Sequence, residues 1–394
     1  MEVDEDATAE RPTVLIVDDQ STNLERLAKL LNDAYRVLIA KSGEKALEII
    51  ARQRLPDVIL LDIVMPGMSG YEVLERLQQE PHTQGIPVIF ITAKREEAEE
   101  AHGLDLGAVD YITKPFSGAV VRARVWTHTQ LKIRSDELAA KNRCLQEQRR
   151  KIEQDLAVAS RIQQTLLPEA QPDDSDYNLA WSYQPCDELG GDALSVIPLS
   201  DGRIALYMLD VSGHGVAAAL VSFVAAQSLR QRVTERGEVS PAAILEALDA
   251  EFPLERFEKF FTILFLIYDP VASEIRYCNA GHPPGLLVRH QGGCETLATG
   301  GLPIGVGGWG SYEEGVVAVG RGDLLLIYTD GLVEFEDSMG TPFSEERLEA
   351  ALEQWRGGTA EGVVRGIERM MAAHTEEVPE DDVTFACLSV RGRR

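Results

Sequence analysis

Two sets of carboxylates in this 394-residue chain have the residue types and spacing for phosphoryl chemistry. In the first set the polar residues stand at the ends of short apolar runs, and its members are Asp18, Asp19, Asp62, Thr92 and Lys114. Three clustered carboxylates repel one another unless a divalent cation binds between them, and hard oxygen ligands favour Mg²⁺. A carboxylate beside such a metal can act as a nucleophile toward a phosphoryl group, whose oxygens a lysine and a hydroxyl can hold.

The elements between these residues predict the sheet that brings them together. Strand-like runs alternate with helical patterns such as Gly43–Arg52 and Gly70–Gln79; the runs are Thr13–Val17, Tyr35–Ala40, Val58–Leu61, Val88–Ile91 and Tyr111–Ile112. This alternation predicts an α/β domain with a doubly wound, parallel, five-stranded sheet. Active sites of such sheets lie at the carboxyl ends of the strands, where the whole first set stands.

The first set, with GMSG after the central aspartate and KPF at the lysine, resembles the receiver domain of two-component response regulators over residues 12–125. The resemblance implies that Asp62 is phosphorylated and that Asp18, Asp19, Asp62 and the Ile63 carbonyl hold Mg²⁺. It implies that Thr92 and Tyr111 form a switch pair and that Lys114 binds the phosphoryl group. It also implies a sensor histidine kinase or phosphotransfer protein as partner. The alternative is a pseudo-receiver that is never phosphorylated.

The second set consists of four acidic motifs in the C-terminal half. The motifs are ELGGDALS, LDVSGHG, IYTDG and EDDVTF, and their acids are Asp192, Asp210, Asp330, Asp381 and Asp382. Any one motif alone would be an ordinary turn. Together, distant carboxylates at strand ends can assemble an oxygen-lined dinuclear metal site that activates water for attack on a phosphate ester. His214 and His282 also lie in turns, and we expect them to cap these turns rather than bind metal.

Strand-like runs separated by Gly and Pro dominate the chain from Tyr177 onward, and four stretches have a helical pattern: Gly215–Arg232, Pro241–Glu251, Ser344–Gln354 and Ala360–His374. Clustered strands with clustered helices predict an α+β domain of stacked sheets covered by helices.

The four motifs, with NAGHPPGLL at Asn279–Leu287 and GLPIG at Gly301–Gly305, resemble bacterial phosphatases of the sporulation protein E and RsbU type. These belong to the PP2C-like (PPM) serine/threonine phosphatases. The resemblance implies an α/β/β/α sandwich over residues 177–391 and a phosphorylated anti-sigma-factor antagonist as substrate. It implies two Mn²⁺ or Mg²⁺ ions bound by the catalytic residues, and the ligands are Asp192, Asp210, the Val211 carbonyl, Asp330 and Asp381. For the last ligand, Asp381 is favoured over Asp382. The family usually reads GGDFYD, whereas Ser195 here replaces the second acid, which predicts weaker metal binding or greater dependence on the linker.

A stretch without Gly or Pro, residues 119–167, separates the two regions and predicts one long helix. Small or apolar residues recur in it every seven positions, at Leu131, Leu138, Leu145, Ile152, Ala159 and Leu166, but the companion heptad column is mostly polar. This half-apolar seam favours a weak, switchable, parallel coiled-coil homodimer. The alternative is a helix that packs on its own domains. The end of the stretch, Ser160–Leu167, also matches the segment with which the phosphatase family switches its catalytic domain.

Composition narrows the class of protein. A net charge of -26 argues against nucleic acid as a partner. The five cysteines show no CxxC spacing, so neither a disulfide framework nor a zinc site is predicted. No apolar run is long enough to cross a bilayer and the N-terminus lacks a signal-peptide pattern, so we expect a cytoplasmic protein without a membrane partner. Residues 1–11 should form a disordered tail and Glu169–Asp176 a polar link.

These observations predict a multidomain response regulator in which phosphorylation of Asp62 controls a metal-dependent serine/threonine phosphatase that regulates a stress sigma factor. The order of receiver, helix and PP2C-like domain also resembles RssB-type regulators. The alternative is therefore an adaptor that binds the general-stress sigma factor and delivers it for proteolysis. A third hypothesis is a scaffold whose output is dimerisation alone.

Overall fold

The computed structural model describes residues 11–52, 55–93, 103–168, 176–235, 239–306, 311–375 and 379–392. The predicted tail and polar link lie outside the described residues, apart from Arg11 and Asp176. The chain divides into two compact units, Met1–Arg150 and Lys151–Arg394. Among the helices of the described residues, none is long and apolar enough to span a lipid bilayer.

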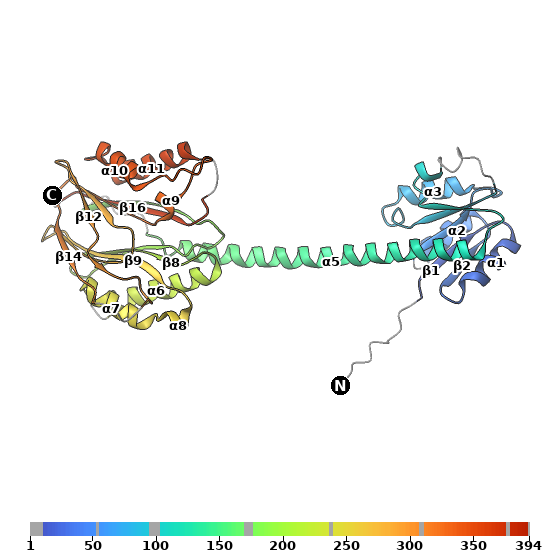
Figure 1. The fold of residues 1–394 in the computed structure, drawn as a ribbon, viewed down its shortest axis with the longest axis horizontal. Helices are drawn as coiled ribbons and strands as arrows, with labels where there is room; N and C mark the ends of the chain where they lie inside the picture. Colours follow the sequence, from blue (N-terminus) through green and yellow to red (C-terminus); the bar gives the residue numbers. More distant parts are fainter. Residues whose placement is uncertain are drawn as a thin grey trace, which may run out of the picture. The chain divides into compact units, whose positions relative to one another are not determined.

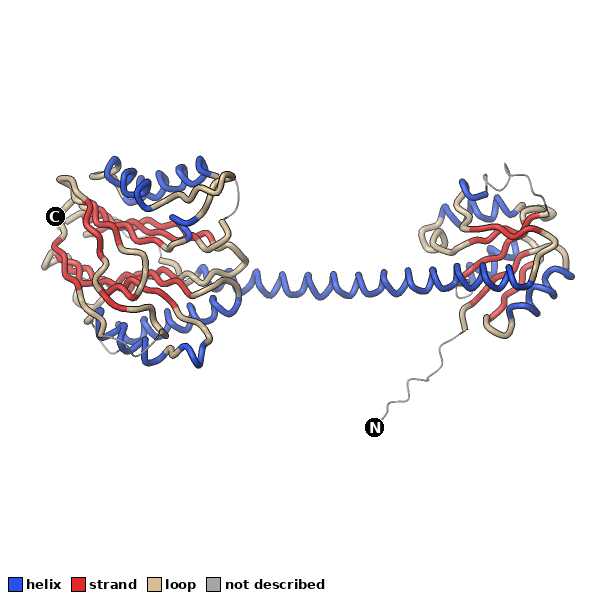
Figure 2. Tube along the Cα trace, in the orientation of Figure 1, coloured by secondary structure: helices blue, strands red, loops and turns tan. Residues whose placement is uncertain are grey.

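The first unit contains the parallel five-stranded sheet that the sequence predicts. Its strands are β1 (Thr13–Val17), β2 (Arg36–Ala40), β3 (Val58–Asp62), β4 (Val88–Thr92) and β5 (Asp110–Thr113), in the order β2-β1-β3-β4-β5. Alternate residues of β1 enter two separate apolar cores: Leu15 packs with residues of α2 (Gly43–Arg52) and α3 (Gly70–Gln79), whereas Ile16 packs with α1 (Ser21–Leu31). Helices therefore cover both faces of the sheet (Figures 1 and 2).

The predicted long helix is α5, which runs without interruption over 47 residues, Gly118–Gln164. Its first turns pack on the parallel five-stranded sheet through the buried side chains of Val121 and Val125. Farther along, the apolar column with seven-residue spacing is exposed to solvent: Leu131, Leu138, Leu145 and Ile152 are 58%, 62%, 61% and 60% exposed. At about 1.5 Å per residue, the helix spans roughly 70 Å.

The second unit is built on two sheets. The first has the strand order β13-β10-β9-β8-β7 with β14 beside β10, and the second has the order β12-β11-β15-β16-β6. The strands are β6 (Tyr177–Gln184), β7 (Ala193–Pro198), β8 (Ile204–Val211), β9 (Phe261–Asp269), β10 (Glu274–Ala280), β11 (Gly285–Val288), β12 (Cys294–Leu297), β13 (Gly300–Gly301), β14 (Gly315–Ala318), β15 (Leu324–Tyr328) and β16 (Val383–Val390).

Helices cover the outer face of each sheet, so this unit has four layers (Figure 1). On one side lie α6 (Val216–Glu235), α7 (Pro241–Glu251) and the short α8 (Leu254–Phe257); on the other lie α9 (Gly331–Glu334), α10 (Glu345–Gln354) and α11 (Ala360–His374). Three apolar cores separate the layers. The central one joins the two sheets through residues such as Leu264 and Leu325. The predicted α/β/β/α sandwich is confirmed.

Candidate functional site

The carboxyl edge of the receiver sheet brings the first set of acids together. Asp18 and Asp19 follow β1, and Asp62 ends the neighbouring strand β3. Ligand oxygens of these three residues all lie within 4.8 Å of one another. Lys114, which follows β5, places its Nζ 2.9 Å from Asp18 Oδ2 and 2.9 Å from Asp62 Oδ2. The ammonium group therefore balances part of the negative charge at this edge.

The environment of these acids fits a divalent cation. Burial raises the pKa of Asp62, and Lys114 opposes this rise. Burial by itself would lower the pKa of Lys114, but its hydrogen bonds to Asp62 and Asp18 outweigh that effect and raise it. Asp18 is held in place by the Gln20 amide N–H, 2.8 Å from its Oδ1. Within the described part of the chain, Asp19 Oδ1 is buried without a hydrogen-bond partner. Such an oxygen is costly unless a cation or water satisfies it.

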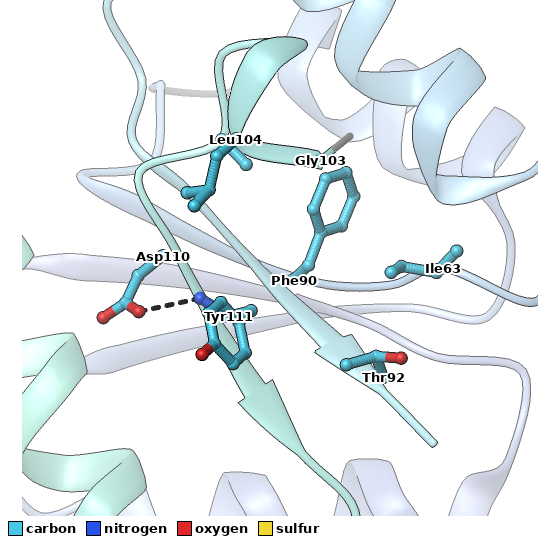
Figure 3. A pocket seen from close by; sticks show the side chains of 8 residues that line it. Ile63, Phe90, Thr92, Gly103, Leu104, Asp110 and Tyr111 are labelled. Carbon is cyan, nitrogen blue, oxygen red and sulfur yellow. Dashed lines mark hydrogen bonds between the residues drawn. The ribbon is translucent and has the colours of Figure 1, made fainter. Parts of the chain in front are cut away.

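The predicted switch residues lie where the sheet meets α5. Thr92 ends β4, Tyr111 lies in β5, and both line a small cavity that also contacts Phe90 and Leu104 (Figure 3). Arg124 of α5 donates a hydrogen bond of 2.6 Å to the Tyr111 carbonyl, and its guanidinium lies 5.4 Å from the centre of the Tyr111 ring. A rearrangement at Tyr111 would therefore act directly on the first turns of α5.

Asp110 strengthens the attachment of α5 to β5. Its carboxylate forms an ion pair with Arg124, and His128 Nε2 lies 3.1 Å from its other oxygen. Sequence reasoning missed these partners, because acids and bases on β5 and α5 have no distinctive spacing along the chain.

In the second unit, the four acidic motifs converge from both sheets. Asp192 stands directly before β7, Asp210 is near the end of β8, Asp330 follows β15 and Asp381 precedes β16. Burial, followed by the charges of Asp330 and Asp381, raises the pKa of Asp210 to about 7. Burial and the charge of Asp210 raise the pKa of Asp192 well above its usual range. The charge of Asp210 therefore acts on Asp192, and the charges of Asp330 and Asp381 act on Asp210.

Two glycines allow the loops of these motifs to pack backbone against backbone. A Cβ on Gly191 would stand 3.0 Å from the Val211 carbonyl oxygen, and one on Gly331 would collide with the Asp382 carbonyl oxygen. The GGD loop thus lies against the Val211 carbonyl, and the TDG turn lies against the end of the EDD motif. This close approach explains why glycine stands beside Asp192 and Asp330.

The two adjacent acids of the last motif have different surroundings. Asp382 is buried; its Oδ1 accepts a hydrogen bond of 2.9 Å from the Cys186 amide, and its Oδ2 one of 2.5 Å from the Gly191 amide. Asp381 is exposed, and its Oδ1 accepts from the Asp382 amide. Asp382 therefore holds loops together, whereas Asp381 is oriented as a candidate ligand.

Asp192 has the surroundings of a metal ligand. It is 1% exposed, and its Oδ2 accepts a hydrogen bond of 2.9 Å from the Thr329 hydroxyl. Of its two oxygens, Oδ1 is buried and has no hydrogen-bond partner among the residues that the structure describes. An ionised carboxylate in this position is unfavourable unless a cation compensates for its charge.

Ser195, the departure from the family pattern, lies in β7 directly opposite Tyr207 of β8. Its side chain is buried and hydrogen bonds to Tyr207; burial raises the pKa of Tyr207 to about 12, and the bond to Ser195 opposes that rise. Ser195 therefore has a packing partner inside the sheet.

Gln163, near the end of α5, contacts the loop that carries Asp192. Its Nε2 donates a hydrogen bond of 2.6 Å to the Gly190 carbonyl, and its Oε1 accepts one of 3.3 Å from the Gly190 amide. Sequence reasoning did not single out this residue. The only signal was its place within the Ser160–Leu167 segment, which the sequence analysis expected to resemble a switch segment.

Both regions are similar to known proteins. Residues 14–125 match the response regulator receiver domain, and residues 200–391 match stage II sporulation protein E (SpoIIE). A Vibrio cholerae protein named "Probable cyclic di-GMP phosphodiesterase" is 48% identical over 130 residues, which is 33% of this chain and 29% of that protein. The response regulator PleD of Caulobacter vibrioides is 44% identical over 126 residues, 32% of this chain and 28% of PleD. The chain thus spans less than a third of the length of these relatives.

A solved structure shows the fold of the second unit. The SiaA-PP2C domain of Pseudomonas aeruginosa is 22% identical, with a TM-score of 0.53, and the match covers 61% of this chain and 98% of that domain.

Proposed function

We propose that the chain is a response regulator in which phosphorylation of Asp62 controls a metal-dependent protein serine/threonine phosphatase. The matches of its two regions to the receiver domain and to SpoIIE support this proposal. The observation that carries the catalytic part is the buried, unpartnered Oδ1 of Asp192, whose carboxylate feels the charge of Asp210, while Asp210 in turn feels the charges of Asp330 and Asp381. Two Mn²⁺ or Mg²⁺ ions held by these acids and the Val211 carbonyl would supply an activated water and positive charge for attack on the phosphate ester.

The surroundings of the nearest cysteine favour this chemistry over catalysis by a thiol. Burial, followed by the negative charge of Asp382, raises the pKa of Cys186 to about 12. A thiol with this pKa is protonated at neutral pH and is a poor nucleophile.

The proposed partners follow from the two domains. The receiver requires a sensor histidine kinase or phosphotransfer protein that supplies the phosphoryl group. For the phosphatase we propose a phosphorylated anti-sigma-factor antagonist as substrate, and thereby control of a stress sigma factor. The RssB-like adaptor stays an alternative prediction, but the four carboxylates are all present, which favours an enzyme.

Hydrolysis assays on the wild-type chain test the proposed activity. We expect turnover of para-nitrophenyl phosphate and of phosphoserine and phosphothreonine peptides with Mn²⁺ or Mg²⁺, and loss of turnover with excess EDTA. A phosphotyrosine peptide serves as the substrate control. Absence of turnover with every metal, with and without a small-molecule phosphodonor, would contradict the enzyme proposal, and sigma-factor binding would then be the assay of choice.

Substitution of Gln163 should weaken catalysis without changing the metal ligands. Gln163→Ala removes both hydrogen bonds between α5 and Gly190. One such bond contributes about 0.5–1.5 kcal/mol, so if the transition state loses the equivalent of one bond, we expect kcat to fall roughly twofold to tenfold while KM changes little. The matched control is Gln164→Ala, because Gln164 is the exposed neighbour on the same helix. Equal kcat values for the two variants would show that this contact does not position the Asp192 loop.

We also propose that α5 pairs with a second copy of the chain. Its exposed apolar column would be covered in a parallel coiled coil. Leu138→Glu with Leu145→Glu should therefore shift the mass in solution from dimer toward monomer, as measured by light scattering. Ala140→Glu introduces the same charge on an exposed position away from this column and should leave the mass unchanged. A wild-type chain that is monomeric with and without a phosphodonor would contradict pairing.

A further inference from the structure

Cys186, Asp187 and His214 form a compact group of ligand types outside the proposed dinuclear site. Each offers one ligand atom, and these atoms all lie within 4.8 Å of one another. His214 Nδ1 lies 2.8 Å from Asp187 Oδ2. Asp187 and His214 are exposed and Cys186 is partly exposed, so an ion from solvent can reach the group. Metal binding is therefore an alternative to the turn-capping role expected for His214.

The fold holds these side chains in place from two directions. Cys186 and Asp187 follow β6, and the Cys186 amide donates to the buried carboxylate of Asp382. His214 lies in the turn between β8 and α6, where Gly213 and Gly215 have φ of +75° and +83°. In the second segment, the Ser212 amide, two residues before His214, donates a hydrogen bond of 2.9 Å to the Phe260 carbonyl, so the backbone on which each ligand stands is fixed near the site.

The donor atoms select the kind of cation. A thiolate, an imidazole and a carboxylate form a borderline-soft set that suits Zn²⁺, which commonly takes three protein ligands and leaves a fourth position to water. Mg²⁺ and Mn²⁺ prefer oxygen donors alone, which is what the neighbouring carboxylate site offers. Burial, followed by the charges of Asp382, Asp187 and Asp381, raises the pKa of the Cys186 thiol, so a cation that binds the sulfur must displace its proton.

We infer that Cys186, Asp187 and His214 bind one Zn²⁺ ion, in a site separate from the proposed dinuclear centre. On binding, the Cys186 Sγ–H bond breaks, the proton passes to solvent and a bond between sulfur and the metal forms, so affinity increases with pH. The ion links the loop that leads to Asp192 with the turn that follows Asp210. The site does not depend on the phosphatase proposal, because binding can occur whether or not the enzyme turns over.

Cobalt titration of the full chain, freed of metal by a chelator and then kept in excess Mg²⁺, tests this inference. Co²⁺ occupies zinc sites and, when bound to a thiolate, absorbs in the near ultraviolet through sulfur-to-metal charge transfer. We expect this band to saturate at one equivalent and to disappear when Zn²⁺ is added. Co²⁺ bound only to carboxylates lacks the band, which separates this site from the oxygen-lined one.

Variants identify the ligands. Cys186→Ser should abolish the band, and Asp187→Asn should weaken Co²⁺ binding at least tenfold, a typical loss for a perturbed metal site. Cys294→Ser removes another exposed cysteine and should leave the titration unchanged. Circular dichroism checks that each variant is folded. Absence of the band from the wild type, or its persistence in Cys186→Ser, would overturn the inference. If Cys186→Ser fails to fold, Asp187→Asn decides: an affinity for Co²⁺ equal to that of the wild type would overturn the inference.

Discussion

Asp62→Ala should abolish phosphorylation of the chain by a small-molecule phosphodonor, and with it any response of the phosphatase to that donor. The Asp62 carboxylate lies at the edge where Asp18, Asp19 and Lys114 can hold a cation and the phosphoryl oxygens. Alanine has no oxygen to accept the phosphoryl group, so we expect a complete loss rather than a partial one. Intact-mass spectrometry measures the added phosphoryl group, and the hydrolysis assay with and without phosphodonor measures the response.

The matched control is Asp33→Asn, at an exposed aspartate after α1. This variant should be phosphorylated like the wild type. Lys114 also forms an ion pair with Asp18, so we expect the lysine to stay in place when Asp62 is replaced. A phosphatase that still responds to the donor in Asp62→Ala would refute the proposed coupling through this residue.

Asp210→Asn and Asp330→Asn should each reduce metal-dependent hydrolysis by a factor on the order of 10³, equivalent to about 4 kcal/mol of activation free energy. Each amide keeps the shape of the side chain but removes a negative charge from the carboxylate group that would hold the ions. The matched control is Asp155→Asn, at an exposed aspartate of α5. Its hydrolysis activity, measured as a function of Mn²⁺ concentration, should match that of the wild type. Unchanged turnover in both site variants would exclude these residues as metal ligands.

The thermal stability of Asp210→Asn should increase although its activity falls, which distinguishes loss of catalysis from misfolding. The pKa of Asp210 is about 7 in the folded protein, against an ordinary value of 3.8. The folded state therefore binds the proton more tightly, so this group's contribution to stability is present at low pH and is lost as pH rises from about 4 to 7. Without metal, Asp210→Asn should melt several degrees above the wild type at pH 8.

Calorimetry at several pH values measures this difference. The gap in Tm should narrow as pH falls from 8 toward 4, because the wild-type carboxyl then becomes protonated in the folded protein. Addition of Mn²⁺ should raise the Tm of the wild type more than that of Asp210→Asn. A metal-free variant that melts below the wild type at pH 8 would show that the Asp210 charge is compensated within the fold.

The sequence by itself determined the receiver sheet and the length of α5. Apolar runs such as Thr13–Val17 and helical patterns such as Gly70–Gln79 coincide with the observed elements, because a buried parallel strand and an amphipathic helix leave local patterns in the chain. The strands β6 (Tyr177–Gln184) and β7 (Ala193–Pro198) lie in the region predicted to be rich in strands, but the sequence did not single them out. Their sequences mix polar and apolar residues, and their pairing with β16 and β8 depends on contacts distant in sequence.

Only the tertiary structure decided how neighbouring acids and distant polar residues are used. Asp381 and Asp382 are adjacent and chemically identical, yet the amides of Cys186 and Gly191 bind Asp382 and leave Asp381 exposed. The contact of Gln163 with Gly190 and that of His214 with Asp187 likewise join segments 27 residues apart. Hydrogen-bond partners and ligand groups depend on which backbones pack together, and packing between separate segments leaves no periodic pattern in the sequence.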